Sequence, residues 1–250
     1  MQIDFTGKRA IVCGGSRGIG RAIALGFAEA GADVSICARG AETLETTRRE
    51  ITQCGHKAHA AVCNLADAAA IGRYVAEAAR ALDGIDVLVN NASGFGNSDD
   101  AAGWEASVAI DMMAVVHASQ AALGHLRESK GNIVNISSIS AMRPAARQPP
   151  YGAIKAAVSH YTTTQAAMYA RDGIRANAVA PGSIEFPGGV WDRRKKEAPE
   201  LYQRVFRTIP FGRMGRPEQV ASVVLFLASP LANWVTGQCI AVDGGQLLGA

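Results

Sequence analysis

The amino-acid sequence predicts an α/β fold in which a doubly wound, mostly parallel sheet carries helices on both faces. Short apolar runs alternate with longer segments of helical periodicity along the chain, and this alternation is typical of parallel strands joined by right-handed crossovers. Glycine-rich or polar turns follow several of the apolar runs. The 250 residues, 48% of them hydrophobic, contain no linker-like or low-complexity tract. We therefore expect a single domain over residues 1–250.

Charge and hydropathy exclude several classes of protein. The formal net charge is only +3, and no basic stripe with interleaved aromatics is present, so a nucleic-acid partner is not expected. No uninterrupted apolar run approaches the ~18 residues of a membrane span, and the N-terminus lacks the apolar core of a signal peptide. The five cysteines are odd in number and lie mostly in apolar runs. This pattern indicates reduced core thiols in a cytoplasmic protein that does not bind a membrane.

The first strand is expected at residues 8–13, directly before a glycine loop. Gly14, Gly18 and Gly20 lie in this loop, and a helical pattern follows at 21–31. Glycines let the backbone approach a pyrophosphate, and the N-terminus of the helix offers free N–H groups and the positive end of its dipole. The order of strand, loop and helix therefore predicts a dinucleotide site, with a plain tight turn as the alternative.

The second strand, residues 33–38, ends at Arg39. A site for NAD(H) would carry an acidic residue near this point to hold the ribose hydroxyls, and the sequence has none there. Guanidinium groups bind phosphate oxygens in a bidentate manner, so Arg39 and Arg17 suit a 2′-phosphate. The sequence favours NADP(H) over NAD(H); the alternative is that both arginines are solvated surface charges.

The next elements continue the alternation. We expect a helix at 41–53, a strand at 58–63, a helix at 66–82 and a strand at 85–89, which opens into the small and amide residues 90–94. Such residues at the carboxyl end of a strand suit a crevice where a flat cofactor lies close to the backbone.

One cluster in this region has residue types that bind metals. Cys54, His56, His59 and Cys63 are closely spaced, but a tetrahedral site needs converging ligands. Residues 59–63 resemble a buried strand, whose alternate side chains point apart. We therefore predict no metal site.

The second half of the chain repeats the pattern. Helices are expected at 101–127, 151–171 and 217–228, and strands at 132–137, 174–180 and 238–242. Ligands of such sheets lie at the carboxyl ends of the strands. The glycine loop, residues 90–94, Ser138 and Pro181-Gly182 all fall at this edge, which marks it as the functional one.

Three residues at this edge can perform proton chemistry on a carbonyl group. Tyr151 and Lys155 are four apart, so both lie on one helix face. A nearby ammonium makes a phenol easier to ionise, which would make Tyr151 a usable acid or base near neutral pH. Ser138 could hydrogen-bond the substrate oxygen. Because Tyr-x-x-x-Lys is a common spacing, the alternative is a surface pair on an ordinary helix.

From about residue 5 to residue 245, the chain resembles the short-chain dehydrogenase/reductase family. The matching motifs are the glycine loop, Asn90-Asn-Ala, Ser138 with Tyr151-x-x-x-Lys155, Asn177-x-x-x-Pro181-Gly182, and the tail Val235-Thr-Gly-Gln with Val242-Asp-Gly-Gly. The resemblance implies a single Rossmann-type domain and hydride transfer between a nicotinamide cofactor and a ketone or secondary alcohol. It implies that Tyr151 is the general acid/base, that Lys155 lowers its pKa and holds the nicotinamide ribose, and that Ser138 positions the carbonyl.

The cofactor contacts follow from the same match and from the pattern above. They are Gly14, Ser16, Arg17, Gly18, Ile19, Gly20, Arg39, Asn64, Leu65, Asn91, Ala92, Tyr151, Lys155, Pro181, Gly182 and Ile184. The family usually has an acidic residue where Asn64 stands, but an amide could still bond the adenine. Phe186 replaces a threonine that often contacts the carboxamide of the cofactor.

Asp111 is the departure closest to the chemistry. The family usually places an asparagine there, which completes a water relay to the lysine. An ionised carboxylate accepts hydrogen bonds but cannot donate them. Asp111 could therefore pair with Lys155 and change the path of the proton, so we include it among the catalytic candidates.

The resemblance also implies a substrate lid, at about residues 183–216. Its basic run 193–196 is expected to be a solvated helix face, or else an anion clamp that Arg143 and Arg147 could join. The resemblance favours reduction of a 3-oxoacyl thioester. Another small alcohol, a sugar or a steroid-like substrate is the alternative, as is a cofactor-binding protein with reduced catalysis, for which Asp111 is the only support.

Members of the family are usually homotetramers. The helix at 151–171 carries small residues that permit close packing, namely Ala153, Ala156, Ala157, Ser159, Ala166 and Ala167. These residues could pack against a second subunit or within their own.

Overall fold

The computed structural model describes residues 3–249 and contains one parallel sheet with strand order β3-β2-β1-β4-β5-β6-β7. The strands are β1 (Arg9–Cys13), β2 (Asp33–Ala38), β3 (Ala58–Val62), β4 (Val87–Asn90), β5 (Asn132–Ile136), β6 (Arg175–Pro181) and β7 (Cys239–Val242). The strand order reverses direction between β1 and β4, as in a doubly wound sheet. The predicted fold class is confirmed.

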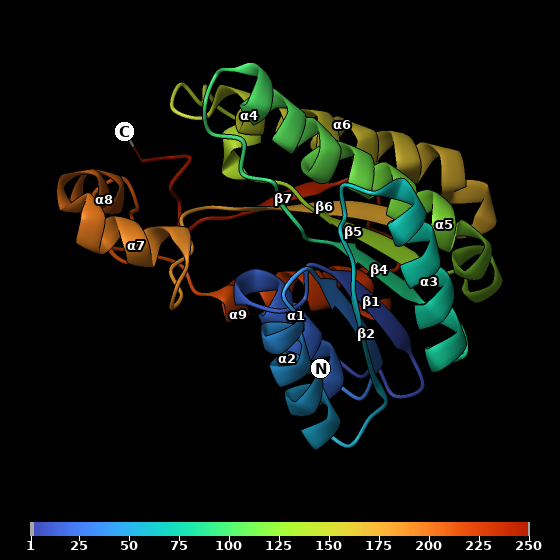
Figure 1. Cartoon of the computed structure of the whole chain (residues 1–250). Coiled ribbons are helices and arrows are strands. Elements are labelled where there is room, and N and C mark those ends of the chain that lie inside the picture. The colour runs from blue at the N-terminus through green and yellow to red at the C-terminus, as the bar shows by residue number, and fades with distance from the viewer. Residues whose placement is uncertain (1–2, 250) are drawn as a thin grey trace.

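Helices cover both faces of the sheet (Figure 1). One face is covered by α1 (Gly18–Glu29), α2 (Ala41–Gln53) and α9 (Pro217–Ala228), and the other by α3 (Ala68–Leu82), α4 (Ala101–Ala106), α5 (Ala114–Ser129) and α6 (Pro149–Tyr169). A π-helical turn, η1 (Ser107–Met113), joins α4 to α5. The short 3₁₀ turns are η2 (Ile139–Ala141), η3 (Ala170–Asp172) and η4 (Pro230–Ala232).

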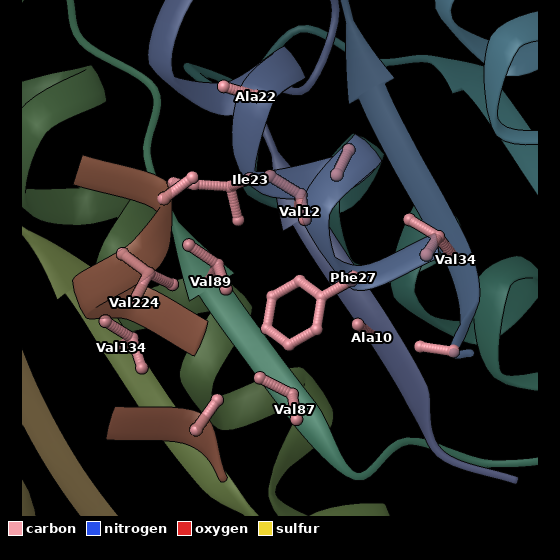
Figure 2. Packing of buried hydrophobic residues seen from close by; sticks show 14 of the residues in the cluster. Ala10, Val12, Ala22, Ile23, Phe27, Val34, Val87, Val89, Val134 and Val224 are labelled. Carbon is pink, nitrogen blue, oxygen red and sulfur yellow. The ribbon is translucent and has the colours of Figure 1, made fainter. Parts of the chain in front are cut away.

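The central strands β1, β2, β4, β5 and β6 are buried on both sides because each sheet face has its own core. The edge strands β3 and β7 are only half-buried, so the expectation of a buried strand at 59–63 is wrong. Ala10 and Val12 of β1 belong to the cluster that includes Phe27 of α1, whereas Ile11 and Cys13 belong to the cluster of the opposite face. Figure 2 shows the ring of Phe27 among the side chains of β1 and β4. Strands that are buried on both sides are expected to be continuous apolar runs, and these runs allowed the strands to be predicted from the sequence.

The bounds of two helices were not assigned from the sequence, although the basic run 193–196 was expected to lie on a helix. These helices are α7 (Val190–Glu197) and α8 (Pro199–Phe206), which fall inside the expected lid and project beyond the end of the sheet (Figure 1). The other predicted elements are present, with boundaries shifted by a few residues. The first helix, for example, begins inside the glycine loop at Gly18 rather than after it.

Within residues 3–249, one helical stretch, Ala101–Ser129, is long and apolar enough to cross a membrane. Length and composition are weak evidence, because the core helix of a globular protein passes the same test. Here the stretch packs against α3 and α6 on one face of the sheet.

Candidate active site

The glycine loop leaves β1 and turns directly into α1. Gly14 and Gly18 have φ angles of 84° and 54°, which glycine adopts without strain. A β-carbon at Gly20 would collide with the carbonyl oxygen of Gly14. Arg17, at the N-cap, makes no side-chain capping bond, and the first turn of α1 has no acidic residue. The free N–H groups at this helix start fit a diphosphate.

The adenosine side of the expected cofactor site lies at the ends of β2 and β3. Arg17 and Arg39 are both exposed, and neither forms an ion pair within the part of the chain that the structure describes. Asn64 is exposed, and its Oδ1 accepts the N–H of Ala66 at 3.2 Å. Leu65 is buried in the core, so only its backbone could face a cofactor.

The remaining predicted contacts meet the loop from β4 and β6. Asn91 Nδ2 donates to the carbonyl oxygen of Gly14 at 2.8 Å, and a β-carbon at Gly14 would lie 3.0 Å from the backbone of Ala92. Pro181 ends β6, and Gly182 follows it. Further predicted contacts around this edge are Ser16, Ile19 and Ile184; Ile184 is buried and Ile19 packs against the same core cluster.

Phe186 lies against the glycine loop. A β-carbon at Gly18 would overlap its ring, so the close approach depends on glycine at that position. The aromatic residue that replaces the family's threonine therefore covers the loop from the base of the lid segment.

The three catalytic candidates are brought together at the carboxyl ends of β5 and β6. Lys155 Nζ donates to the carbonyl oxygen of Ile136 at 2.9 Å and lies 5.6 Å from the ring centroid of Tyr151. Ser138 caps η2, where its Oγ accepts the N–H of Ser140 at 3.1 Å, and its hydroxyl is one of the groups that lower the pKa of Tyr151. Both Ser138 and Lys155 are buried.

A buried polar network fixes α6 against the sheet and was missed in the sequence. Asn90 Nδ2 donates to Asn135 Oδ1 at 2.9 Å, and Asn135 Nδ2 donates to Thr162 Oγ1 at 2.9 Å and to Gln165 Oε1 at 2.8 Å. Ser137 Oγ donates to the carbonyl oxygen of Lys155 at 3.0 Å. Buried networks of this kind hold side chains in one geometry, here on the helix that carries Tyr151 and Lys155, although Gln165 Nε2 has no hydrogen-bond partner of its own.

Asp111 reaches the same site from η1. Its Oδ1 lies 3.0 Å from Lys155 Nζ, and both side chains are almost fully buried. Its Oδ2 accepts the N–H of Gly94 at 3.0 Å. The pairing with Lys155 that the sequence suggested is present in the structure.

Electrostatics at Tyr151 differ from the expectation. Burial raises the pKa of the phenol, Lys155 and Ser138 lower it, Asp111 raises it again, and the pKa ends above its ordinary value of 10.0. Burial lowers the pKa of Lys155, but Asp111 and Tyr151 outweigh burial, so this pKa is raised above 10.5. Lys155 acts on the phenol in the predicted direction; the prediction of a net lowering is wrong because burial and Asp111 oppose it.

Phe95 is a second residue that sequence reasoning missed. Its ring stacks on that of Tyr151, with centroids 5.8 Å apart and planes at 15°, and its φ of 50° lies in the left-handed region. Such a backbone conformation costs a non-glycine residue roughly 1–2 kcal/mol. Its position just after the polar turn 90–94 was the only signal available.

The metal-capable residues do not converge. His59 Nδ1 lies 2.9 Å from Ser35 Oγ, and Cys54 Sγ donates to the carbonyl oxygen of Glu50. No group of three or more potential ligands was found among residues 3–249. All five cysteines are free thiols.

Most side chains of the basic run 193–196 already have partners within the lid segment. Lys195 Nζ pairs with Glu185 at 3.0 Å, Lys196 Nζ pairs with Asp192 at 3.5 Å, and the guanidinium of Arg194 stacks over Trp191 at 4.9 Å. Arg143 Nη1 donates to the carbonyl oxygen of Gln246 at 3.5 Å, and Arg147 is exposed. These contacts make the solvated helix face the simpler interpretation of the lysines.

Proton chemistry beside a diphosphate cradle is the combination that a nicotinamide-dependent oxidoreductase requires. A family model described as "Enoyl-(Acyl carrier protein) reductase" matches residues 14–246. The chain is 37% identical over 255 residues to the 3-oxoacyl-[acyl-carrier-protein] reductase FabG of Aquifex aeolicus (strain VF5), a match that covers 98% of this chain and 100% of the relative.

Solved structures agree with the sequence match. A 7α-hydroxysteroid dehydrogenase complexed with NADH and 7-oxo glycochenodeoxycholic acid superimposes with a TM-score of 0.91 at 32% identity, covering 98% of this chain and 96% of that one. A short-chain dehydrogenase from Burkholderia cenocepacia J2315 in complex with NADP gives a TM-score of 0.89 at 34% identity, covering 97% and 99%. The chain belongs to the short-chain dehydrogenase/reductase family, whose members act on alcohol and carbonyl groups.

Proposed function

We propose that the protein is an NADP(H)-dependent reductase that interconverts a ketone and a secondary alcohol, with Tyr151 as the general acid/base. The observation that carries the proposal is the grouping of the half-buried Tyr151 phenol, the buried Lys155 ammonium and the buried Ser138 hydroxyl at the carboxyl edge of the sheet that also carries the glycine loop. A nicotinamide cofactor, when bound, supplies or takes up the hydride.

The roles of the side chains follow from their positions. Ser138 offers a hydroxyl that hydrogen-bonds the carbonyl oxygen of the substrate. As the carbonyl carbon is reduced, the phenolic proton of Tyr151 passes to that oxygen and a phenolate remains, facing the ammonium of Lys155. In the reverse direction the phenolate takes the proton of the alcohol. Lys155 also lies where it could hold the ribose hydroxyls of the nicotinamide.

The preference for NADP(H) rests on Arg17 and Arg39. Both guanidinium groups are exposed at the end of the site where the adenosine ribose would lie, and no acidic residue follows β2 at the position that binds ribose hydroxyls. Similar proteins were solved with NADP and with NADH, so the arginines of this chain, rather than the fold, support the choice.

For the substrate we favour a 3-oxoacyl thioester, on which the Aquifex aeolicus relative is named as acting. A steroid-like or other small ketone is the alternative, because a structurally similar dehydrogenase carries a bile-acid ketone.

The segment at 183–216 supports a lid: Ile184 bridges Gly215 at its base, and Tyr202, Ile209 and Met214 form a small hydrophobic cluster of its own.

The test is oxidation of NADPH and of NADH by the purified protein over a panel of acyl thioesters, steroid ketones, sugars and simple ketones. We expect turnover with NADPH, and Tyr151→Phe should lower it by about 10²–10⁴-fold while NADPH binding persists. Full turnover by Tyr151→Phe would refute the assigned role of Tyr151. Tight NADPH binding without turnover on any substrate would instead favour a cofactor-binding protein with reduced catalysis.

A further inference from the structure

Asp111 owes its inward position to an unusual stretch of helix. Residues Ser107–Met113 form a π-helix between α4 and α5, and such wide turns are rare and often occur at functional sites. Asp111 is fully buried there, and it meets Lys155, which lies on α6. Two separate elements therefore bring a carboxylate and an ammonium together beneath Tyr151.

The contact between these residues is an attraction of charges. Asp111 Oδ1 lies 3.0 Å from Lys155 Nζ at an angle that is poor for a hydrogen bond, and its Oδ2 accepts the N–H of Gly94. A neutral amide at this position would leave the full positive charge of Lys155 facing the phenol. The carboxylate cancels much of that charge, because both groups lie in a buried, weakly screened environment.

We propose that Asp111 is a positioning residue that neutralises Lys155 and thereby keeps the phenol of Tyr151 protonated, so that the site is set to donate a proton to a carbonyl substrate at neutral pH. The proposal rests on the proposed function of Tyr151 as the general acid/base. It adds the reason why this chain has a carboxylate where the resemblance implies an amide.

The charges that act on Tyr151 agree with this assignment. Lys155 on the same helix and Asp111 on η1 are the charged groups that affect its pKa, burial and Asp111 raise that pKa, and Ser138 beside η2 supplies only a hydroxyl. β5 carries no ionisable side chain, Arg175 at the start of β6 bonds to backbone near α9, and Glu105 of α4 is exposed.

The consequence concerns the pH range in which each direction runs. Reduction needs the phenol and consumes its proton, so its rate stays on a plateau until the pH approaches the raised pKa of Tyr151. Oxidation needs the phenolate as base, so its rate continues to rise into the alkaline range. The amide variant, Asp111→Asn, should ionise Tyr151 at lower pH and move both limbs in the acidic direction.

The experiment follows the ionisation of Tyr151 directly, in the protein without substrate. Phenolate absorbance is titrated in the wild type and in Asp111→Asn, each corrected with the matching Tyr151→Phe protein to remove the other tyrosines. We expect the midpoint to fall by about one pH unit or more in Asp111→Asn. The descending limb of kcat/KM for reduction should move by the same amount. Asp172→Asn, a surface carboxylate paired with Arg127 at 2.9 Å, is the matched control and should move neither.

A lower plateau with an unmoved limb and an unmoved midpoint would show that Asp111 is merely structural, and would overturn the proposal. If Asp111→Asn fails to fold, the wild-type titration still decides, because a midpoint near or below neutral pH contradicts a phenol that stays protonated there. Failure of the proposed function is separate: it would appear as turnover by Tyr151→Phe, whatever the titration shows.

Discussion

Asn91 Nδ2 donates to the carbonyl oxygen of Gly14 at 2.8 Å, and this bond joins the carboxyl end of β4 to the glycine loop after β1. The two strands are neighbours at the point where the strand order reverses. A side-chain amide thus fixes the shape of the loop, and Gly20 packs against both partners of the bond.

The first prediction follows from that packing. Gly20→Ala places a methyl group against the Gly14 carbonyl and the Asn91 amide, so we expect a loss of about 1–3 kcal/mol in unfolding free energy and at least about tenfold weaker NADPH binding, or 1.4 kcal/mol. Urea unfolding and fluorescence titration measure the two effects. Gly124→Ala is the control: no atom lies within 4 Å of its added methyl, and alanine favours a helix interior by about 0.5–1 kcal/mol.

Cofactor choice supplies the second prediction. Replacing Arg39 by Asp removes a guanidinium that would bind the 2′-phosphate and adds the acid expected in a site for NAD(H). A hydrogen bond to a charged group contributes about 1.5–3 kcal/mol, so NADPH affinity should fall roughly 10- to 100-fold. NADH affinity should stay equal or rise. Arg80→Asp, on the exposed surface of α3, should change neither; equal losses for both cofactors in Arg39→Asp would contradict the assignment.

Alkaline stability gives the third prediction. The pKa of Tyr151 is raised above its ordinary value of 10.0, and that of Lys155 above its ordinary value of 10.5. At a pH above these ordinary values, the unfolded chain has released protons that the folded protein still holds. Their contribution is therefore fully present below about pH 10 and is lost as the pH rises through the raised values. In urea unfolding from pH 8 upward, the wild type should lose stability more steeply than Tyr151→Phe above about pH 10. Parallel curves would contradict the raised pKa of Tyr151.

The elements of the sheet were predictable because their signals are local. β1, β4 and β6 are apolar runs bounded at their carboxyl ends by Gly14, Asn90 and Pro181, and α2 and α9 have the boundaries that periodicity indicated. Tyr151 and Lys155 could be paired because a helix fixes the spacing of residues four apart.

The rest of the site depends on contacts between distant segments. No residue near Asp111 predicts a π-helix. The pairing of Asp111 with Lys155 could be suggested only through the family resemblance. The stacking of Phe95 on Tyr151 and the bonds from Asn135 to α6 are tertiary. The net direction of the pKa of Tyr151 could not be predicted, because it depends on burial as well as on neighbouring charges.

The lid gives the fourth prediction. Tyr202 Oη donates to Glu185 Oε2 at 2.7 Å, which ties α8 to the base of the segment. Tyr202→Phe keeps the ring and removes the bond, so α7 and α8 should open more often and KM should rise by several-fold while kcat changes little. Limited proteolysis should cut residues 190–207 faster in the variant. Tyr161→Phe, on α6 outside this segment, is the control. Equal cleavage rates for the wild type and Tyr202→Phe would show that Tyr202 does not hold the lid closed.

Self-association gives the last prediction. We propose that the chain forms a homotetramer and that the outer face of α6 lies in one of its interfaces, because Ala153, Ala156 and Ala167 are exposed there, whereas Ala166 is buried within the subunit. Small exposed side chains let a second helix approach closely, and a charge at their centre would be desolvated on association at a cost of several kcal/mol. Sedimentation equilibrium should therefore show a smaller species for Ala156→Glu. Ala76→Glu, at another exposed alanine, on α3, should leave the assembly intact. An unchanged mass for Ala156→Glu would remove α6 from the interface, and a monomeric wild type would refute self-association itself.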